Sequence, residues 1–452
     1  MTFRIKKARV RDLGLGLALV AAISLPSRPA AGPPSVPPMS HPPTETPVIH
    51  VVPANSPDSS AYHSLASAIA AAHLGAVIEL GPGTYDLTPQ AYSEPTCGNC
   101  DAESTLVRAT VGLRVTGKNI RIVGPRDRVS GTDGSHQNRA VIRTHAGYGI
   151  LFENCDDCAL WGVTVTEGRR DTSQHATDAA VVVKQSTVTI SECTLENNIG
   201  DSRVVAHTVA GIMGIAGREG SRIQVTGNHI LRNSWDGIAL YRGASATIEG
   251  NVIDGVDLAR GTRVGGGRGV GIGVTWNATA EIRGNLVKRY WKGIGAFMDA
   301  QVTVEDNVVE QVATWGLTLW DAGRGRPSGT FTRNVVFRSG ACGASVIRTK
   351  NDPPAPGRFV ENVLVQTGQD PRYDSGEPYC FQEPIARHAV PDSFIIAENV
   401  QFLNRVPGNH PAPGDLDDKE FRAKLETIRA AHARWPCLAQ SEFWTAYGNP
   451  KP

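Results

Sequence analysis

Short runs of alternating apolar and polar residues recur along the chain, and each run closes on one particular position. That position is asparagine in the later runs and glycine or cysteine in the earlier ones: Gly124, Gly162, Cys193, Asn228, Asn251, Asn285, Asn307, Asn334, Asn362 and Asn399. The closest steps are 22 and 23 residues. A period near 22 that is built from short strands is typical of a solenoid, because one repeat is too small to bury its own apolar face.

Each repeat divides into three short strands, for example residues 237–241, 246–249 and 251–254. Alternation within a strand directs one set of side chains inward, so a column of Ile, Val and Leu is expected along the axis. The asparagine is expected at a tight turn, because it tolerates left-handed backbone and its amide can bond the same amide one repeat away. The predicted fold is an all-β parallel β-helix over residues 48–405 with three parallel sheets. A β-sandwich with many short strands is the alternative.

Helical segments are expected at the two ends, since terminal repeats of a solenoid need covering. The Ala-rich stretch 62–74 predicts an N-terminal capping helix. Leu416, Phe421, Leu425 and Ile428 follow helical spacing, so an amphipathic helix is expected over 416–435. Residues 406–452 are therefore predicted to form a C-terminal helical cap or tail.

The first 47 residues predict export. A basic start, an apolar run from Leu13 to Leu25 and small residues such as Ala30 are typical of a signal peptide, here residues 1–32, followed by a Pro-rich linker, residues 33–47. No other apolar run is long enough to span a bilayer. A formal net charge of +1 gives no overall field to attract nucleic acid or an anionic membrane. We expect a secreted or periplasmic monomer with no nucleic-acid partner and no stable membrane insertion.

Eight cysteines are present. Cys97 with Cys100 and Cys155 with Cys158 form two C-x-x-C pairs, and four others stand alone: Cys193, Cys342, Cys380 and Cys437. In an exported protein the expected state is disulfides without a metal. The alternative is a zinc ion bound by the four thiolates of the two pairs.

The segment 64–87, SLASAIAAAHLGAVIELGPGTYDL, and the repeated GI…I.GN.I phrase resemble the pectate-lyase-like superfamily of right-handed parallel β-helices. The resemblance covers roughly residues 50 to 405. It implies a right-handed solenoid and a polysaccharide partner, in a superfamily of lyases, glycoside hydrolases, epimerases, esterases and proteins without known catalysis. The D-P-H-D motif of alginate epimerases and the paired-Asp, G-H-G and R-I-K motifs of polygalacturonases are missing. The resemblance therefore transfers no catalytic residue.

Aromatic residues mark the strand that precedes each asparagine run. Two columns are expected to bind substrate: Tyr241, Trp276, Phe297 and Trp320 at or just after the strand ends, and Trp235, Trp291 and Trp315 before the glycines. Alternation directs Tyr241, Phe297 and Trp320 outward, and repeats stack about 4.8 Å apart, so a strip of rings is expected on one face. Such a strip matches the apolar faces of sugars in a linear glycan. The alternative is that the rings pack beneath loops.

Ionisable side chains recur nine residues before the asparagine position, beginning at Glu153. The candidate catalytic residues are Lys184, Glu219, Arg242, Asp299 and Asp321. A lyase needs a base and a cation that neutralises a uronate carboxylate, which Lys184 and Arg242 can supply. A hydrolase needs two carboxyl groups, which Asp299 and Asp321 can supply, and the same pair can bind Ca²⁺. The alternative is a row of solvated turn charges that separates the repeats.

A polar insertion at residues 167–178 interrupts the repeats. It contains Arg169 and Arg170, which can clamp a carboxylate or sulfate, and His207 opens the next insertion. Arg169 and His207 are therefore candidate substrate contacts, and surface loops without a role are the alternative.

Three functions are compatible with these features. The first is an exported carbohydrate-active enzyme, a lyase or glycoside hydrolase that cleaves or modifies an extracellular polysaccharide, with calcium as a candidate cofactor. The second is a non-catalytic β-helix that binds glycan or builds an envelope structure. The third, a metal-handling periplasmic β-helix, is disfavoured because the chain has four methionines and no Met/His cluster.

Overall fold

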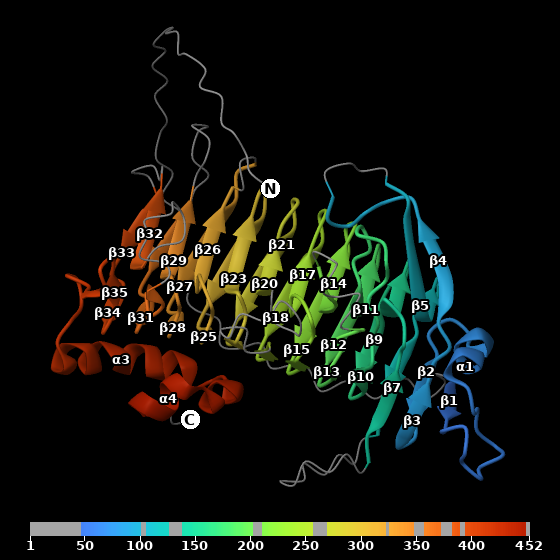
Figure 1. The fold of residues 1–452 in the computed structure, drawn as a ribbon. Coiled ribbons are helices and arrows are strands. Elements are labelled where there is room, and N and C mark those ends of the chain that lie inside the picture. The colour runs from blue at the N-terminus through green and yellow to red at the C-terminus, as the bar shows by residue number, and fades with distance from the viewer. Residues whose placement is uncertain are drawn as a thin grey trace, which may run out of the picture. The chain divides into compact units, whose positions relative to one another are not determined.

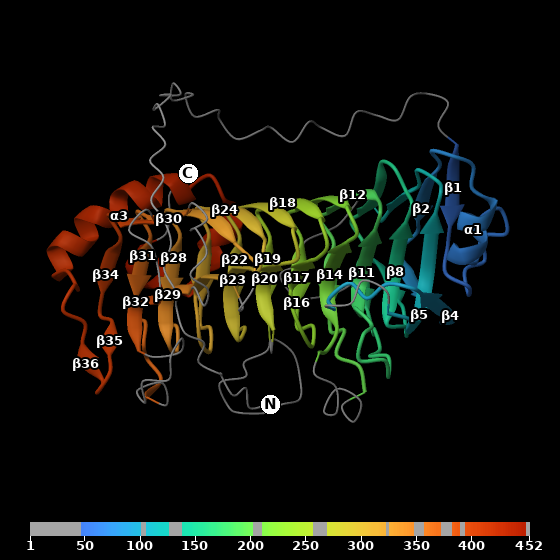
Figure 2. The same cartoon turned by 90° about the horizontal axis from the view of Figure 1, so that it is seen from above.

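The structure is a computed structural model in which residues 47–100, 105–125, 138–201, 210–255, 269–321, 325–347, 357–371, 382–388 and 394–448 are described. Their short strands form three sheets of 12, 11 and 11 strands and one two-stranded hairpin. Within the three sheets, the described strands pair in parallel except β4 with β5. Figures 1 and 2 show successive strands side by side in chain order. The prediction of three parallel sheets is confirmed.

The first sheet contains β1 (Val48–Val51), β2 (Val77–Leu80), β6 (Arg121–Val123), β9 (Cys158–Trp161), β12 (Thr187–Ser191), β15 (Arg222–Thr226), β18 (Ser245–Glu249), β21 (Thr279–Arg283), β24 (Gln301–Glu305), β27 (Ser328–Thr332), β30 (Gly357–Val360) and β33 (Ile395–Ala397). The second contains β3 (Gly83–Asp86), β7 (Ala140–Arg143), β10 (Thr164–Thr166), β13 (Thr194–Glu196), β16 (His229–Leu231), β19 (Val252–Asp254), β22 (Leu286–Lys288), β25 (Val308–Glu310), β28 (Val335–Phe337), β31 (Val363–Val365) and β34 (Val400–Phe402). The third contains β4 (Gln90–Glu94), β5 (Val107–Thr116), β8 (Tyr148–Glu153), β11 (Ala179–Lys184), β14 (Met213–Arg218), β17 (Ile238–Leu240), β20 (Val270–Val274), β23 (Lys292–Phe297), β26 (Leu317–Trp320), β29 (Cys342–Ile347) and β32 (Glu383–His388). The hairpin is β35 (Arg405–Val406) with β36 (His410–Pro411).

Each turn of the chain passes through the third sheet, then the first, then the second, as β8, β9 and β10 do. Inward side chains of successive turns pair in register, and the third sheet gives one column: Ile150, Val181, Ile215, Ile238 and Ile272. All five are buried in one core cluster that also contains apolar residues of the other two sheets. The period-2 pattern thus becomes a continuous apolar interior, because every turn buries its inward face against the turns on either side.

Asparagine side chains are stacked at the corner between the first and second sheets, from Asn228 through Asn399. In each step the backbone N–H and the side-chain amide of one asparagine donate to Oδ1 of the next, at 2.8–3.1 Å. Cys193 occupies the corner position one turn earlier and donates its N–H to Asn228 Oδ1 at 2.9 Å. The predicted ladder is confirmed.

Two details of the predicted corner are wrong. The left-handed residue is the one before the asparagine, for example Gly227 or Gly250, both with φ of 64°. Gly162, with φ of 69°, has this preceding role, since Trp161 pairs with Ser191 and the residue opposite Cys193 is Val163. The left-handed position before the asparagine is glycine in the earlier turns of the ladder and Asp306, Arg333, Glu361 or Glu398 in the later ones, while the asparagine provides the hydrogen bonds.

The N-terminal end of the interior is covered by α1 (Leu65–Ala71), which begins after the capping residue Ser64. Leu65, Ala68 and Ile69 of this helix belong to the interior core cluster. The predicted capping helix is confirmed, within shorter bounds.

The C-terminal segment forms α3 (Asp418–His432), the 3-10 helix η2 (Pro436–Gln440) and α4 (Glu442–Tyr447). Phe421, Leu425 and Ile428 of α3 are buried in one cluster with outward residues of the second sheet, such as Val335 and Val363. The helices therefore lie against the outer face of the second sheet and do not cover the C-terminal end of the solenoid. No helix in the described part of the chain is long and apolar enough to span a membrane.

Replacing Asn251 by leucine is predicted to destabilise the protein by about 1–3 kcal/mol, because a buried group left without a partner costs about that much. The change removes the acceptor for Asn228 and the donor to Val225 O and Asn285 Oδ1. Asn399→Leu is the matched control, since Asn399 is half-buried at the end of the ladder. Urea midpoints measure both variants, and equal shifts would contradict the role of the ladder.

His432 is predicted to make the C-terminal helices sensitive to acid. Burial lowers the pKa of His432 from 6.5 to about 4. Trp444 Nε1 donates to His432 Nδ1 at 3.1 Å, so the proton lies on Nε2, which donates to Arg333 O at 2.9 Å. Because the unfolded chain gains the proton first, stability present above pH about 6.5 is lost as pH falls towards 4, on the order of 3 kcal/mol.

Thermal midpoints at pH 7.5 and 4.5 test this sensitivity, with His432→Gln as the comparison. Glutamine can donate and accept but does not titrate, so the variant should lose less stability on acidification than the wild type. An identical loss in the two proteins would count against His432 as the source.

Candidate functional site

The strand ends of the third sheet bring one side chain from each turn into a single outer column. Strand pairing places Glu153, Lys184 and Arg218 in register, and Phe297 in register with Trp320. The N–H of Tyr241 bonds Gly217 O at 2.8 Å, so Tyr241 continues the column after Arg218. This column, running along the outer edge of one sheet, is where charged and aromatic side chains accumulate.

The predicted ionisable column is one residue out of register from Glu219 onward. Two residues, 185–186, lie between Lys184 and the next strand, β12. Three residues, 219–221, lie between Arg218 and the next strand, β15. Glu219 lies in the left-handed turn with φ of 45°, and Arg242 and Trp276 take the equivalent turn position. Arg218 was missed because counting from the asparagine assumes turns of equal length.

Four charged side chains form a buried network on the outer face of the third sheet: Glu94, Glu153, Lys184 and Arg218. Glu219, in the tight turn directly after Arg218, adds a fifth. Lys184 Nζ lies 2.8 Å from Glu94 Oε2 and 3.4 Å from Glu153 Oε1. Arg218 Nη1 lies 2.8 Å from Glu94 Oε1, and its Nε lies 2.6 Å from Glu219 Oε2. The guanidinium of Arg218 is completely buried. Lys184 and Glu219 are therefore committed to ion pairs inside the protein, and neither is an open base or acid.

Two tyrosines and an arginine complete the network. Tyr148 donates to Glu94 Oε1 at 2.7 Å, and Tyr92 donates to Glu153 Oε1 at 2.9 Å. Burial raises the pKa of both phenols, so they remain protonated donors. Burial also opposes ionisation of Glu153, but hydrogen bonds from Arg114 and Tyr92 outweigh it and lower its pKa. The arrangement is a satisfied set of charges, which stabilises one packing of the face.

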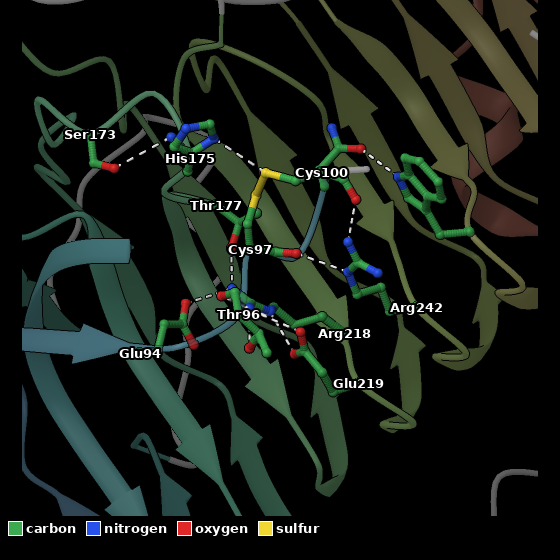
Figure 3. Close-up of a disulfide and its surroundings, with 12 residues drawn as sticks. Glu94, Thr96, Cys97, Cys100, Ser173, His175, Thr177, Arg218, Glu219 and Arg242 are labelled. Carbon is green, nitrogen blue, oxygen red and sulfur yellow. Dashed lines mark hydrogen bonds and ion pairs between the residues drawn. A yellow bond between two sulfur atoms is a disulfide. The ribbon is translucent and has the colours of Figure 1, made fainter. Parts of the chain in front are cut away.

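The network is covered by residues 94–100, which leave β4 and cross the outer face; we call them the crossing segment (Figure 3). Arg218 Nη2 donates to Thr96 O at 2.9 Å, and Arg242 Nε donates to Cys97 O at 2.8 Å. Trp276 Nε1 donates to Asn99 Oδ1 at 2.8 Å. Arg242 was predicted to be catalytic and Trp276 to bind substrate, and in the structure both side chains anchor the crossing segment.

Tyr241 points outward as predicted but is buried, so it is not an exposed sugar platform. It packs with Met213, Ala239 and Cys97 under the crossing segment. Its hydroxyl lies beside Asp236, whose burial raises the carboxyl pKa to about 7. Trp235 and Trp276 pack at the border of the same cluster. These aromatic side chains follow the alternative in which rings pack beneath loops.

A second group of aromatic side chains lies further along the sheet; we call Trp291, Lys292, Phe297, Trp315 and Trp320 the aromatic cluster. The ring of Trp320 meets Phe297 and Trp315 edge-on, with centroids 6.4 and 5.7 Å apart. Lys292 Nζ lies 3.7 Å from the ring centroid of Trp291 and 4.7 Å from that of Trp315. Trp291 is 45% exposed, Phe297 and Trp320 are half-buried, and Trp315 is buried. Lys292 is the cation that sequence reasoning missed, although it lies between Trp291 and the next glycine.

Polar atoms without partners accumulate at the aromatic cluster. Among the described residues, Trp315 Nε1, Trp320 Nε1, Thr318 Oγ1 and Ser345 Oγ are buried and have no hydrogen-bond partner. Thr318 pairs with Ser345 on the neighbouring strand, in the outward column. Buried donors normally find partners, so these four unpaired atoms distinguish the aromatic cluster from the buried network, whose charges are satisfied.

Asp299 and Asp321 follow the strands that end in Phe297 and Trp320. Asp299 is exposed, and its Oδ1 accepts the N–H of Arg326 at 2.9 Å. Asp321 is buried. Of the five predicted catalytic residues, Asp299 is the exposed one, and both carboxyl groups border the aromatic cluster rather than the buried network.

The insertion at 167–178 is mostly a structural element. Arg170 is buried against Asp178, and Asp171 accepts the N–H of Thr110 at 2.8 Å. Arg169 is exposed and remains a candidate contact. His207 lies outside the described residues.

The two C-x-x-C pairs lie in different places. Cys97 and Cys100 form a disulfide in the crossing segment, whereas Cys155 and Cys158 are free thiols in the interior core. A four-thiolate zinc site is therefore excluded. In the described part of the chain, one group of three metal-ligand side chains converges, Cys97, Cys100 and His175, and it is not a calcium-type carboxylate set.

The family-model comparison agrees with this architecture. Residues 129–265 match the family model described as the right handed beta helix region, and the protein is a right-handed parallel β-helix. Similar solved structures include the pectate lyase Pel9A, with 17% identity, 70% of this chain and 79% of that chain covered, and a TM-score of 0.41. The alginate lyase of Paenibacillus sp. strain FPU-7 has 15% identity, 78% and 98% coverage, and a TM-score of 0.36. No curated protein matches the sequence.

The Glu94→Gln variant is predicted to lose about 3–5 kcal/mol of stability, because it removes the carboxylate shared by two buried cations. Glu281→Gln is the control, since Glu281 is exposed and pairs with Arg283 at 2.7 Å, and the change should alter stability by about 0.5 kcal/mol or less. Urea unfolding followed by circular dichroism measures both. A small effect at Glu94 would mean that the network is not structural.

Proposed function

We propose that this protein binds a polysaccharide at the aromatic cluster, on the outer face of the third sheet. The observation that carries the proposal is the exposed ring of Trp291, with Lys292 against it and Trp315 and Trp320 behind it. A sugar ring can stack on the open surface of such a side chain, and polar groups beside it fix the orientation of the ligand.

The positive charge beside the exposed ring favours one class of polysaccharide. The ammonium of Lys292 adds attraction for a sugar carboxylate, which favours an acidic polysaccharide such as a polyuronate.

Successive turns suit a linear polymer. Phe297 and Trp320 pair on neighbouring strands, about 4.8 Å apart, so contacts of one kind repeat along the solenoid axis. The buried network offers no such surface, since Lys184, Glu219 and Arg242 are directed to partners inside the protein.

Cleavage of the bound polysaccharide is the second candidate function. It is favoured by the position of Asp299, two residues after Phe297, and of Asp321, directly after Trp320, with Asp299 exposed. Two carboxyl groups on neighbouring turns are what a glycoside hydrolase requires, one to donate a proton and one to activate water or attack the sugar.

We further propose that the protein acts outside the cytoplasm, as a secreted or periplasmic protein. Residues 1–32 support this through their basic start and apolar run, and the Cys97–Cys100 disulfide suits an oxidising compartment.

Trp291→Ala is predicted to weaken polysaccharide binding about tenfold or more, because a central aromatic anchor contributes on the order of 2 kcal/mol. Calorimetric titration with acidic and neutral polysaccharides measures the dissociation constants. Tyr62→Ala is the control, since Tyr62 is 40% exposed but lies beside β1. Loss of binding in the Tyr62 variant, or none in the Trp291 variant, would refute the site.

The same preparations are incubated with the polysaccharide that binds and assayed for new reducing ends and for the ultraviolet absorbance of a lyase product. New reducing ends without that absorbance, abolished in Asp299→Asn with binding retained, would establish the hydrolase. Binding without any cleavage would establish a non-catalytic glycan-binding β-helix.

A further inference from the structure

Three side chains with metal-ligand chemistry converge above the buried network. Cys97 and Cys100 belong to the crossing segment, and His175 comes from the insertion at 167–178 (Figure 3). His175 Nδ1 lies 3.2 Å from Cys100 Sγ. The two sulfur atoms and one imidazole nitrogen all lie within 4.8 Å of one another. Cys97 is buried, Cys100 is half-buried and His175 is exposed, so the group is open to solvent on the His175 side.

The crossing segment is held by contacts that do not involve its sulfur atoms. Arg242 donates to the carbonyl oxygens of both Cys97 and Cys100, and Arg218 donates to Thr96 O at 2.9 Å. The backbone of Gly98 lies against the side chain of Arg218, because a Cβ added at Gly98 would be 2.9 Å from Arg218 Nε. Because the anchors bind backbone oxygens, the segment keeps its position when the bond between the sulfur atoms opens.

The insertion is held independently. Arg170 is buried against Asp178 and donates to Ser173 O at 3.0 Å, and the N–H of His175 donates to Ser173 Oγ at 3.4 Å. His175 is therefore presented to the two cysteines by a rigid element rather than by a free loop.

We propose that Cys97, Cys100 and His175 bind one thiophilic divalent metal ion of the zinc class, and that the Cys97–Cys100 disulfide is the metal-free, oxidised state of the same site. A dithiol reductant opens the disulfide by thiol–disulfide exchange: it gives two electrons and two protons, yields two thiols and becomes a disulfide itself. Metal binding then displaces the two thiol protons, and two thiolates with a neutral imidazole hold the ion.

The dimensions of the group fit this set. Zinc binds thiolate sulfur at about 2.3 Å and imidazole nitrogen at about 2.0–2.1 Å, so tetrahedral ligand atoms lie roughly 3.5–3.8 Å apart. That spacing lies inside the 4.8 Å envelope. Three protein ligands leave the fourth position for water or an external ligand.

The other C-x-x-C pair provides an internal contrast. Cys155 Sγ lies 3.2 Å from Val115 O, and Cys158 Sγ lies 3.0 Å from Lys118 O, both in the interior core. Among the described residues, no third metal-ligand side chain converges on this pair. The sequence motif alone therefore does not distinguish the two pairs, whereas the position of His175 does.

The test uses the full chain, oxidised or reduced with a phosphine that is then removed under anaerobic conditions. Co²⁺ is titrated as a spectroscopic probe, followed by displacement with Zn²⁺. We expect one metal per reduced chain with thiolate-to-cobalt absorption, and none per oxidised chain. His175→Ala should weaken binding tenfold or more, and Cys100→Ser should abolish it.

Cys155→Ser with Cys158→Ser is the matched control and should leave the stoichiometry and affinity unchanged. Far-ultraviolet circular dichroism of every variant checks the fold, and the oxidised wild type provides a folded protein without thiols at this site. Three outcomes overturn the proposal: no metal bound by the reduced wild type, equal affinity in His175→Ala, or loss of the metal in the Cys155/Cys158 variant.

Discussion

The amide ladder between the first and second sheets is the constraint on which the outer surface depends. Each asparagine bonds both the backbone N–H and the side-chain amide of its neighbour, so a slip of one turn by one residue would break two buried hydrogen bonds at once. The ladder thereby fixes which residue of one turn lies beside which residue of the next. The turns that carry the paired residues Phe297 and Trp320 have their corners at Asn307 and Asn334, so the ladder holds the register of these two residues from the opposite edge of the first sheet.

That register divides one face into two chemically different parts. Towards the N-terminus the strand ends carry charges, and the crossing segment buries them with complementary partners. Towards the C-terminus they carry aromatic rings, among which Trp291 remains exposed and several polar atoms lack partners. A satisfied network resists ligands, because any ligand would have to replace ion pairs already made. At the aromatic cluster a ligand can stack on the exposed ring of Trp291 without replacing a buried ion pair, so this cluster is the better candidate site.

The sequence predicted the features that recur in every turn of the solenoid, and it did not predict the features that occur once. The asparagine position and the inward column follow from a period that recurs many times, so the fold and its core could be read from it. Which residues occupy the outer column depends on the length of the tight turn that follows each strand. A count of nine residues back from the corner fits Lys184, which is followed by a two-residue turn, but it misses Arg218, which is followed by three residues. The crossing segment could not be predicted, because Cys97 and Arg242 are 145 positions apart and no periodic signal links them.

The crossing segment also explains why chemistry and stability meet at one place. Arg218 serves the buried carboxylates on one side and the backbone of Thr96 on the other, so the charges that order the sheet also position the two cysteines. Its guanidinium is buried and cannot move without uncovering Glu94. Metal-binding side chains on a segment that is held by such a network need little further ordering when the metal binds. The conformational entropy of the segment was already lost on folding. The outer face is therefore preorganised at Cys97, Cys100 and His175, while the aromatic cluster gains its remaining contacts from the ligand it binds.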